Sequence, residues 1–153
     1  MEKKATTQKT TSTFRLEHSV RRTVRATPAR VWTLLTDAAQ FPQWNSTVTR
    51  LDGPIELGRK LRIEVAAAPG RVFTPRVTEL SPTRAMTWTD GMAPMFRGIR
   101  TFTLSEAPDG TEFAMTEAFT GIMLPLVRRS LPDFGPIFET YAEDLARAAE
   151  GAR

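Results

Sequence analysis

The chain contains no cysteine and only one histidine, and these shortages exclude several kinds of chemistry. Without cysteine there is no disulfide framework, no thiol nucleophile and no thiolate metal site. With His18 as the single histidine, neither a two-histidine metal site nor a histidine–cysteine pair can be built. No motif indicates a cofactor, so we expect neither a metal nor a cofactor.

Long apolar runs are also missing. No stretch approaches the roughly 20 apolar residues of a membrane-spanning helix, so we expect no stable membrane insertion. Residues 1–14 carry charge but no apolar run, which is typical of neither a signal peptide nor an anchor, and we expect a cytoplasmic protein. The composition predicts a disordered tail at residues 1–13, followed by one domain at residues 14–153.

Acidic residues are fewer than basic ones, 17 against 21, and the formal net charge is +4. The acidic residues are interspersed among the basic ones, and neither a dense basic run nor a base-stacking aromatic motif is present. We therefore expect no nucleic-acid partner. A cluster of Arg21, Arg22 and Arg25 leaves docking to an anionic membrane open.

The last residues, 131–153, predict a long amphipathic helix. Its apolar residues recur at spacings of three and four. They are Phe134, Ile137, Phe138, Tyr141, Leu145 and Ala148. Such a stripe must be buried, and the short strands predicted before it favour a curved antiparallel sheet as its partner. Pro132 and Pro136 predict a separate turn at residues 124–130 and a regular helix from about Asp133.

The first strand and two short helices are predicted near the N-terminus. Residues 14–25 alternate with a period of two. One face carries Leu16, His18, Val20, Arg22 and Val24. Thr27 as N-cap and Pro28 at the first helical position predict a helix ending near Asp37. A second short turn carries Phe41 and Trp44.

Two segments carry a family resemblance. The run ATPARVWTLLTDAAQFPQWN at 26–45 and the ending GIMLPLVRRSLPDFGPIFETYAEDL at 121–145 resemble the SRPBCC superfamily. This START-like or Bet v 1-like group includes polyketide cyclases and lipid-transfer proteins, and the resemblance extends over about residues 16–150. It implies an α+β helix-grip fold: a curved seven-stranded antiparallel sheet around a long C-terminal helix, two short helices after the first strand, and an apolar cavity. It implies no role for any individual residue.

Four further strands are predicted between the two short helices and the last hairpin. Residues 46–52 and 60–66 predict two of them, and residues 71–80 and 83–89 predict a hairpin around Ser81 and Pro82. The expected cross-strand pairs are Glu79 with Arg84, Val77 with Met86, and Pro75 with Trp88. The loop at 90–95 that follows presents Met92 and Met95 as a flexible apolar rim.

The last predicted hairpin places two charged residues on an apolar face. Residues 96–106 and 111–121 flank a turn at 107–110. The expected pairs are Glu106 with Thr111, Leu104 with Phe113, Phe102 with Met115, Arg100 with Glu117, and Gly98 with Phe119. One side of the ribbon is then apolar except for Arg100 and Glu117, which lie directly opposite each other.

Arg100 and Glu117 are the candidate functional pair, because an ion pair on an apolar face is costly in desolvation and rarely stabilises a fold by itself. Arg100 could hold a carboxylate, phenolate or phosphate, and a desolvated Glu117 could act as a general acid or base. Two structural alternatives remain open: the groups neutralise each other beside the last helix, or they reach water at a cavity mouth. His18 is either a cavity group or a structural or partly exposed side chain. Asp90 is either a turn residue or a cavity group.

The expected ligand is a hydrophobic small molecule. The predicted ligand-binding residues are Arg100, Glu117, Trp88, Met86, Phe102, Met115, Phe119, Phe134 and Phe138. The favoured function is binding or transport of a lipid or polyketide-like molecule between sheet and helix. The alternative is a polyketide cyclase, aromatase or dehydratase with polar cavity residues. A third class, a partner-binding module, would carry an exposed apolar patch outside the cavity. No pattern specifies an oligomeric state.

Overall fold

A computed structural model of the chain describes residues 5–151 and contains eight strands in that range. The strands are β1 (Thr6–Ser12), β2 (Arg15–Val24), β3 (Val48–Asp52), β4 (Arg62–Val65), β5 (Arg76–Ser81), β6 (Ala85–Met92), β7 (Phe96–Ala107) and β8 (Gly110–Thr120). The helices are α1 (Pro28–Thr36), α2 (Phe41–Trp44), α3 (Leu124–Val127) and α4 (Phe134–Gly151), with 3-10 turns at Ala38–Gln40 and Arg128–Ser130.

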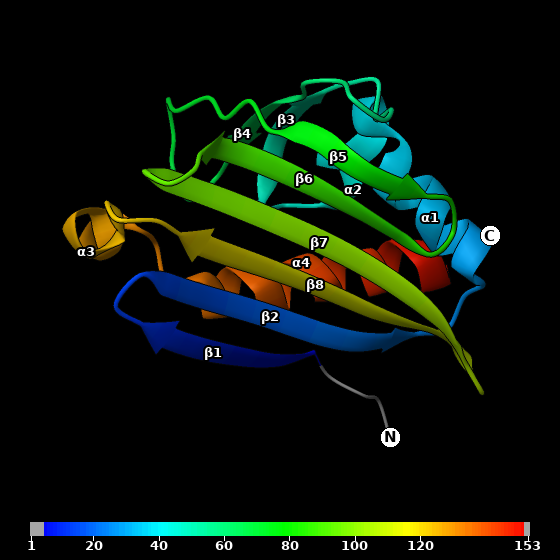
Figure 1. Cartoon of the computed structure of the whole chain (residues 1–153). Coiled ribbons are helices and arrows are strands. Elements are labelled where there is room, and N and C mark those ends of the chain that lie inside the picture. The colour runs from blue at the N-terminus through cyan, green and yellow to red at the C-terminus, as the bar shows by residue number, and fades with distance from the viewer. Residues whose placement is uncertain (1–4, 152–153) are drawn as a thin grey trace.

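The large antiparallel sheet has six strands in the order β1-β2-β8-β7-β6-β5, and α4 lies along one of its faces (Figure 1). The expected α+β architecture with a C-terminal helix is confirmed. The expected seven-stranded sheet is wrong, because β3 and β4 form a separate two-stranded sheet. Two isolated bridges, Lys60 to Arg76 and Ile63 to Phe73, and a few further backbone hydrogen bonds join β4 and the residues before it to the β5 side. Pro75 lies between them and has no N–H to donate, so the ladder is interrupted.

The N-terminal segment differs from the expected tail. Thr6–Ser12 form β1, which pairs with β2 from Thr6 opposite Arg21 to Ser12 opposite Arg15. Residues 1–4 lie outside the described range. Every side chain of β1 is exposed, so the segment has no apolar pattern to reveal it. Threonine favours extended backbone, and the edge of β2 offers unpaired N–H and C=O groups, so pairing needs no apolar burial.

The strand and helix signals near the N-terminus are confirmed. Leu16, His18, Val20, Arg22 and Val24 are buried, as their alternation predicts. The Thr27 side chain accepts a hydrogen bond from the Arg30 N–H, so it caps α1, and the helix ends at Asp37. The separate turn predicted at residues 124–130 is also present, as α3 followed by Arg128–Ser130.

The two predicted hairpins have different outcomes. All five predicted pairs between β7 and β8 are present, including Arg100 opposite Glu117. The register of β5 and β6 is wrong: Val77 pairs with Trp88, and Leu80 pairs with Met86. A bulge between Val77 and Glu79 shifts the pairing, and the turn that follows Ser81 holds Thr83 at a φ of 62°. The alternation of apolar and polar residues in the two strands predicts neither this bulge nor the conformation of this turn.

The core forms where α4 meets the sheet from Tyr141 onward. Tyr141 and Leu145 are buried there, whereas Phe134 and Ile137 nearer the start of α4 are only half-buried. The ring of Tyr141 stacks on Phe113 with the ring centroids 6.4 Å apart. One end of α4 is therefore packed solid and the other is not. None of the helices described within residues 5–151 is long and apolar enough to cross a membrane.

The arginine cluster near the end of β2 is not a free basic patch. The guanidinium of Arg22 is buried and donates to both oxygens of Glu143 on α4, at 3.1 and 3.0 Å. Arg21 donates to Glu112 at 3.2 Å. These pairs neutralise two of the three arginines, so docking through this cluster is not supported.

Glu143 provides a test of how strongly the first strands are held to α4. Partial burial raises the pKa of this carboxyl, but hydrogen bonds from Arg22 and from the Ala5 N–H outweigh it, so the pKa is lowered overall. A lowered folded-state pKa adds stability above the unfolded value of about 4.3, and this stability is lost as the pH falls through the folded value. We expect Glu143→Gln to reduce the free energy of unfolding by about 1 kcal/mol at neutral pH and to match wild type at an acidic pH below the folded-state pKa of Glu143.

Urea titrations at both pH values measure this difference. The matched control is Glu139→Gln, because Glu139 is exposed on the same helix and forms no ion pair within residues 5–151. An equal gap between Glu143→Gln and wild type at both pH values would contradict the electrostatic explanation.

Candidate ligand-binding cavity

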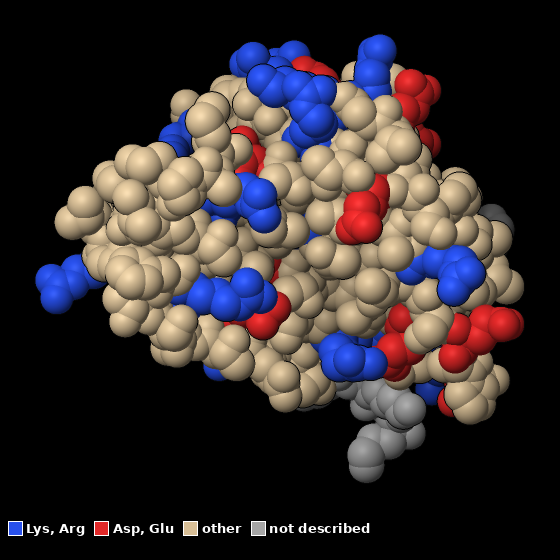
Figure 2. All heavy atoms as spheres, viewed as in Figure 1, with Lys and Arg blue, Asp and Glu red and all other residues tan. Residues whose placement is uncertain are grey.

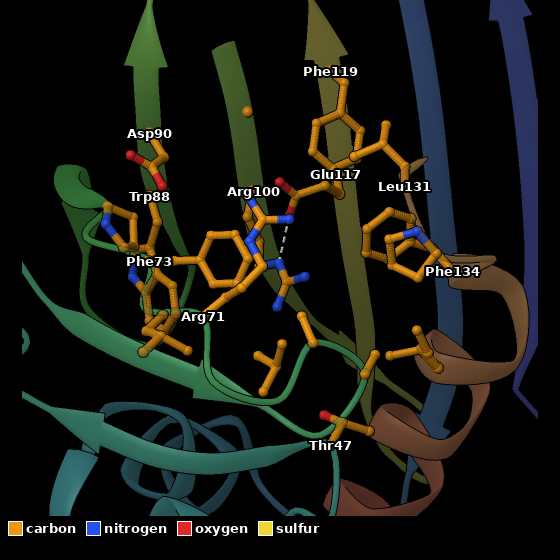
Figure 3. Close-up of a pocket in the computed structure, with 18 of the residues that line it drawn as sticks. Thr47, Arg71, Phe73, Trp88, Asp90, Arg100, Glu117, Phe119, Leu131 and Phe134 are labelled. Carbon is orange, nitrogen blue, oxygen red and sulfur yellow. Dashed lines mark hydrogen bonds and ion pairs between the residues drawn. The ribbon is translucent and has the colours of Figure 1, made fainter. Parts of the chain in front are cut away.

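A cavity of about 510 Å³ lies between the sheet, the β4–β5 connection and the first half of α4 (Figure 3). Most of its lining is apolar or aromatic. The sheet contributes Trp88, Asp90, Phe96, Gly98, Arg100, Glu117 and Phe119; the β4–β5 connection contributes Arg71, Phe73 and Pro75; and α4 with the residues before it contributes Leu131, Phe134, Ile137, Phe138 and Tyr141. The half-buried part of α4 thus forms one wall of a hollow.

The Arg100–Glu117 pair lies on the sheet wall of this cavity. The Nε of Arg100 donates to Oε1 of Glu117 at 2.6 Å, and the two side chains are 20% and 13% exposed. The guanidinium carbon lies 5.3 Å from the centre of the Phe138 ring and 5.9 Å from that of Tyr141. A carboxylate and two ring faces therefore hold the cation in place.

Two guanidinium nitrogens of Arg100 remain available. Within residues 5–151 only Nε of this side chain has a hydrogen-bond acceptor. The terminal nitrogens form the outer edge of a planar fork, which matches the geometry of a carboxylate or phosphate. The Nε–Oε1 contact neutralises the two charges, and the Arg100 side chain is 20% exposed, so both structural alternatives of the sequence analysis stay open for this pair.

Arg71 and Phe73 are site residues that the sequence interpretation missed. Arg71 is exposed, its guanidinium carbon lies 5.2 Å from the centre of the Phe73 ring, and Figure 3 shows it on the Arg100 side of the cavity. Both lie in the part of the expected strand 71–80 that is wrong, because β5 begins only at Arg76 and residues 71–75 belong to the connection before it. Asp90 also lines the cavity, and its Oδ1 accepts from the Gly91 N–H at 2.9 Å, so it is both a turn residue and a cavity group.

His18 lies behind the cavity wall. Its ring is 5.2 Å from that of Phe134 and 6.3 Å from that of Phe138, and it does not line the cavity. Burial and, to a smaller extent, Lys9 lower the pKa of His18 against the opposing effect of Asp133. The imidazole is therefore neutral at neutral pH and supports the two phenylalanines as a structural side chain.

Six of the nine predicted ligand-binding residues line the cavity: Arg100, Glu117, Trp88, Phe119, Phe134 and Phe138. Met86, Phe102 and Met115 do not, because all three are fully buried in the core. Phe102 and Met115 form the cross-strand pair two residues beyond Arg100 and Glu117. Alternation identifies the correct face of the sheet, but position along the strand decides whether a residue meets α4 or the hollow.

Two polar atoms in wall residues are buried without a partner within residues 5–151, the hydroxyl of Tyr141 and Nε1 of Trp88. Burial raises the pKa of the Tyr141 phenol, with a smaller opposing effect of Arg100, so the group stays protonated. An unsatisfied buried donor costs about 1–3 kcal/mol, so these walls are not optimised for stability alone. In the same described range no cluster of three or more acidic or histidine side chains could hold a metal ion.

The antiparallel sheet, the long C-terminal helix and the cavity between them define a protein of the helix-grip class. The chain belongs to the family described as polyketide cyclase / dehydrase and lipid transport, whose family model matches residues 14–150. The SRPBCC resemblance of the sequence is thereby confirmed. Among curated proteins, none matches this chain significantly.

Solved structures share the fold at low sequence identity. A protein from Rhodobacter sphaeroides is 24% identical over 95% of this chain and 99% of its own, with a TM-score of 0.71. One from Mesorhizobium loti is 22% identical over 90% of this chain and 98% of its own, with a TM-score of 0.72. The di-domain ARO/CYC protein StfQ of the steffimycin biosynthetic pathway is 13% identical over 90% of this chain and 51% of its own, with a TM-score of 0.66. At these identities the likeness shows the fold alone.

Proposed function

We propose that the protein binds a hydrophobic small molecule, a lipid or a polyketide-like compound, with an anionic end at Arg100. The observation that carries this proposal is the outer edge of the Arg100 guanidinium, which has no acceptor within residues 5–151 and lies in a largely apolar cavity. A volume of about 510 Å³ is within the usual size range of small-molecule sites.

Burial of the apolar part of the ligand supplies most of the affinity, at about 25 cal/mol per Å² of apolar surface removed from water. Aromatic side chains from three directions provide that contact: Phe73 from the β4–β5 connection, Trp88 and Phe119 from the sheet, and Phe134 and Phe138 from α4. The ligand orientation comes from Arg100, because Glu117 already satisfies Nε and leaves the terminal nitrogens for a carboxylate or phenolate.

Gly98 lies on the cavity wall, so a larger side chain at this position would fill part of the cavity. A Cβ at this position would lie 3.1 Å from Oε2 of Glu117 and 3.4 Å from Cε1 of Phe119, and Gly98 does not have a positive φ. We expect Gly98→Leu to retain the fold and to weaken binding of a fluorescent fatty acid at least about tenfold, because the new side chain occupies the space of the ligand.

Fluorescence titration with the fatty acid measures this effect, and circular dichroism confirms the fold of each variant. Gly151→Leu is the matched control, because Gly151 is exposed at the end of α4 and no other side chain within residues 5–151 comes within 4 Å of the position that its Cβ would take. Equal affinity of Gly98→Leu and wild type would reject the cavity as the binding site.

A second candidate function is a cyclisation or dehydration reaction of a polyketide-like substrate. The family description favours it, as does Glu117, a carboxylate 2.6 Å from Arg100 on the cavity wall. In such a reaction Glu117 would remove or return a proton while Arg100 stabilises developing negative charge. Mass spectrometry of a bound polyketide after incubation separates the two functions, because a carrier releases its ligand unchanged and an enzyme releases a product.

A further inference from the structure

Five large apolar side chains are exposed at one end of the molecule, and we call them the tip patch. They are Phe14 (54% exposed), Met92 (74%), Met95 (47%), Ile122 (55%) and Leu126 (76%). They come from three places in the sequence: the β1–β2 turn, the β6–β7 turn, and the β8–α3 junction with α3 itself. Figure 1 shows α3 and the β6–β7 turn at the same end of the sheet.

Backbone hydrogen bonds join these three segments into one surface. The Ile122 N–H donates to the Pro94 carbonyl at 3.0 Å, and the Gly121 N–H donates to the Phe14 carbonyl at 3.2 Å. Gly121 has a φ of +133°, and a Cβ there would lie only 2.3 Å from the Met95 carbonyl oxygen. Only glycine allows this close approach, so the chain brings the apolar tips together by a specific backbone arrangement.

Three arginines close in sequence to the segments of the tip patch have no carboxylate partner in the described part of the chain. Within residues 5–151 Arg97, Arg128 and Arg129 form no ion pair. Arg128 instead donates to the Thr11 hydroxyl and to the carbonyls of Ser12 and Thr13, which holds the β1–β2 turn beside the turn after α3. Figure 2 shows this end as a mostly uncharged surface with basic side chains at its border and no acidic side chain on the tip in that view.

The tip patch is continuous with one edge of the cavity. Gly91 and Phe96 line the cavity and flank the turn that carries Met92 and Met95. Residues 130–132, which also line the cavity, lie at the end of the 3-10 turn that follows α3 and just after it. A surface that contacts the tip patch therefore lies next to this edge of the cavity.

We propose that the tip patch docks the protein on an anionic lipid membrane, with its apolar side chains in the interfacial region and its arginines against lipid headgroups. Side chains projecting from separate turns suit a soft apolar boundary, whereas a protein partner would need a matching rigid surface. The unpaired arginines supply charge complementarity to anionic headgroups. This docking goes beyond ligand binding and gives the cavity direct access to apolar molecules dissolved in the bilayer.

Co-sedimentation with vesicles tests the proposal. We expect wild-type protein to bind vesicles of phosphatidylcholine with phosphatidylglycerol more tightly than vesicles of phosphatidylcholine alone. The double variant Met92→Ser/Leu126→Ser should bind the anionic vesicles about tenfold more weakly, and Arg129→Glu should also bind them more weakly. Leu57→Ser is the matched control, because Leu57 is 62% exposed in the β3–β4 connection and should bind as wild type does.

Three outcomes would overturn the proposal: no binding of wild type to anionic vesicles, equal binding by the double variant, or equal weakening by Leu57→Ser. A wild-type dimer in solution that the double variant dissociates would also overturn it, because the patch would then join two copies of this chain. Neither Met92 nor Leu126 lines the cavity, so fatty-acid affinity in the absence of vesicles should be unchanged in the double variant. A failure of docking and a failure of ligand binding are therefore separate results.

Discussion

Replacing Arg100 with methionine is expected to weaken binding of a fatty acid by about ten- to a hundredfold, because a hydrogen-bonded charge contributes roughly 1.5–3 kcal/mol. The loss should depend on the ligand charge. A fatty alcohol with the same chain lacks the carboxylate that Arg100 would hold, so its affinity should change much less. Titration of Arg100→Met and wild type with both ligands measures this difference, and an equal loss for acid and alcohol would contradict an anion-binding role.

The same substitution should also destabilise the protein, because it leaves the mostly buried Glu117 carboxylate without its cation. Removing one partner of a buried pair costs about 3–5 kcal/mol, and since these side chains are 20% and 13% exposed we expect about 2 kcal/mol. Arg100→Met/Glu117→Leu removes both charges and should recover most of this stability in urea titrations while fatty-acid binding stays weak. Recovery of binding together with stability would show that Arg100 acts only through the fold.

Truncating Phe102 should cause the largest loss of stability among the predicted ligand-binding residues. Its ring is fully buried, 4.8 Å from that of Trp88 and 6.5 Å from that of Tyr141. A buried phenylalanine replaced by alanine costs about 3–5 kcal/mol, so we expect Phe102→Ala to lower the melting temperature by about 10 °C. Phe14→Ala makes the same chemical change at a side chain that is 54% exposed and should cost less than about 1 kcal/mol.

Chemical and thermal denaturation of the two alanine variants measure these costs. If Phe102→Ala lost no more stability than Phe14→Ala, the space around Phe102 would be a ligand cavity and not packed core, as the sequence interpretation proposed. The pair of variants thus separates core from cavity wall on the same sheet.

The last hairpin and the first strand show what alternation can predict. Every predicted pair between β7 and β8 is present, because two long strands joined by a tight turn have one register that keeps the apolar residues on the same face. The sequence alone therefore predicted that Arg100 lies opposite Glu117. The β5–β6 register failed because a bulge between Val77 and Glu79 shifts the pairing without changing the composition of either strand.

Other parts of the site and of the fold are not predicted by alternation. The sequence predicts a strand at residues 71–80, but the strand begins only at Arg76, and the fold brings Arg71 and Phe73 to the cavity from the connection before it. The strand Thr6–Ser12 is also invisible to hydrophobic patterns, because backbone pairing with β2 holds it while all its side chains stay exposed.

By itself the sequence determined the faces: which side of each long strand is apolar, which side of the last helix is buried, and that Arg100 and Glu117 share an apolar side. These features follow from local periodicity, which can be read from the residues just before and after each position in the sequence. Only the tertiary structure decided where along those faces α4 packs against the sheet and where it leaves a hollow. Packing depends on the distance between elements that are remote in the sequence, so Phe102 belongs to the core and Arg100, two residues away, belongs to the cavity.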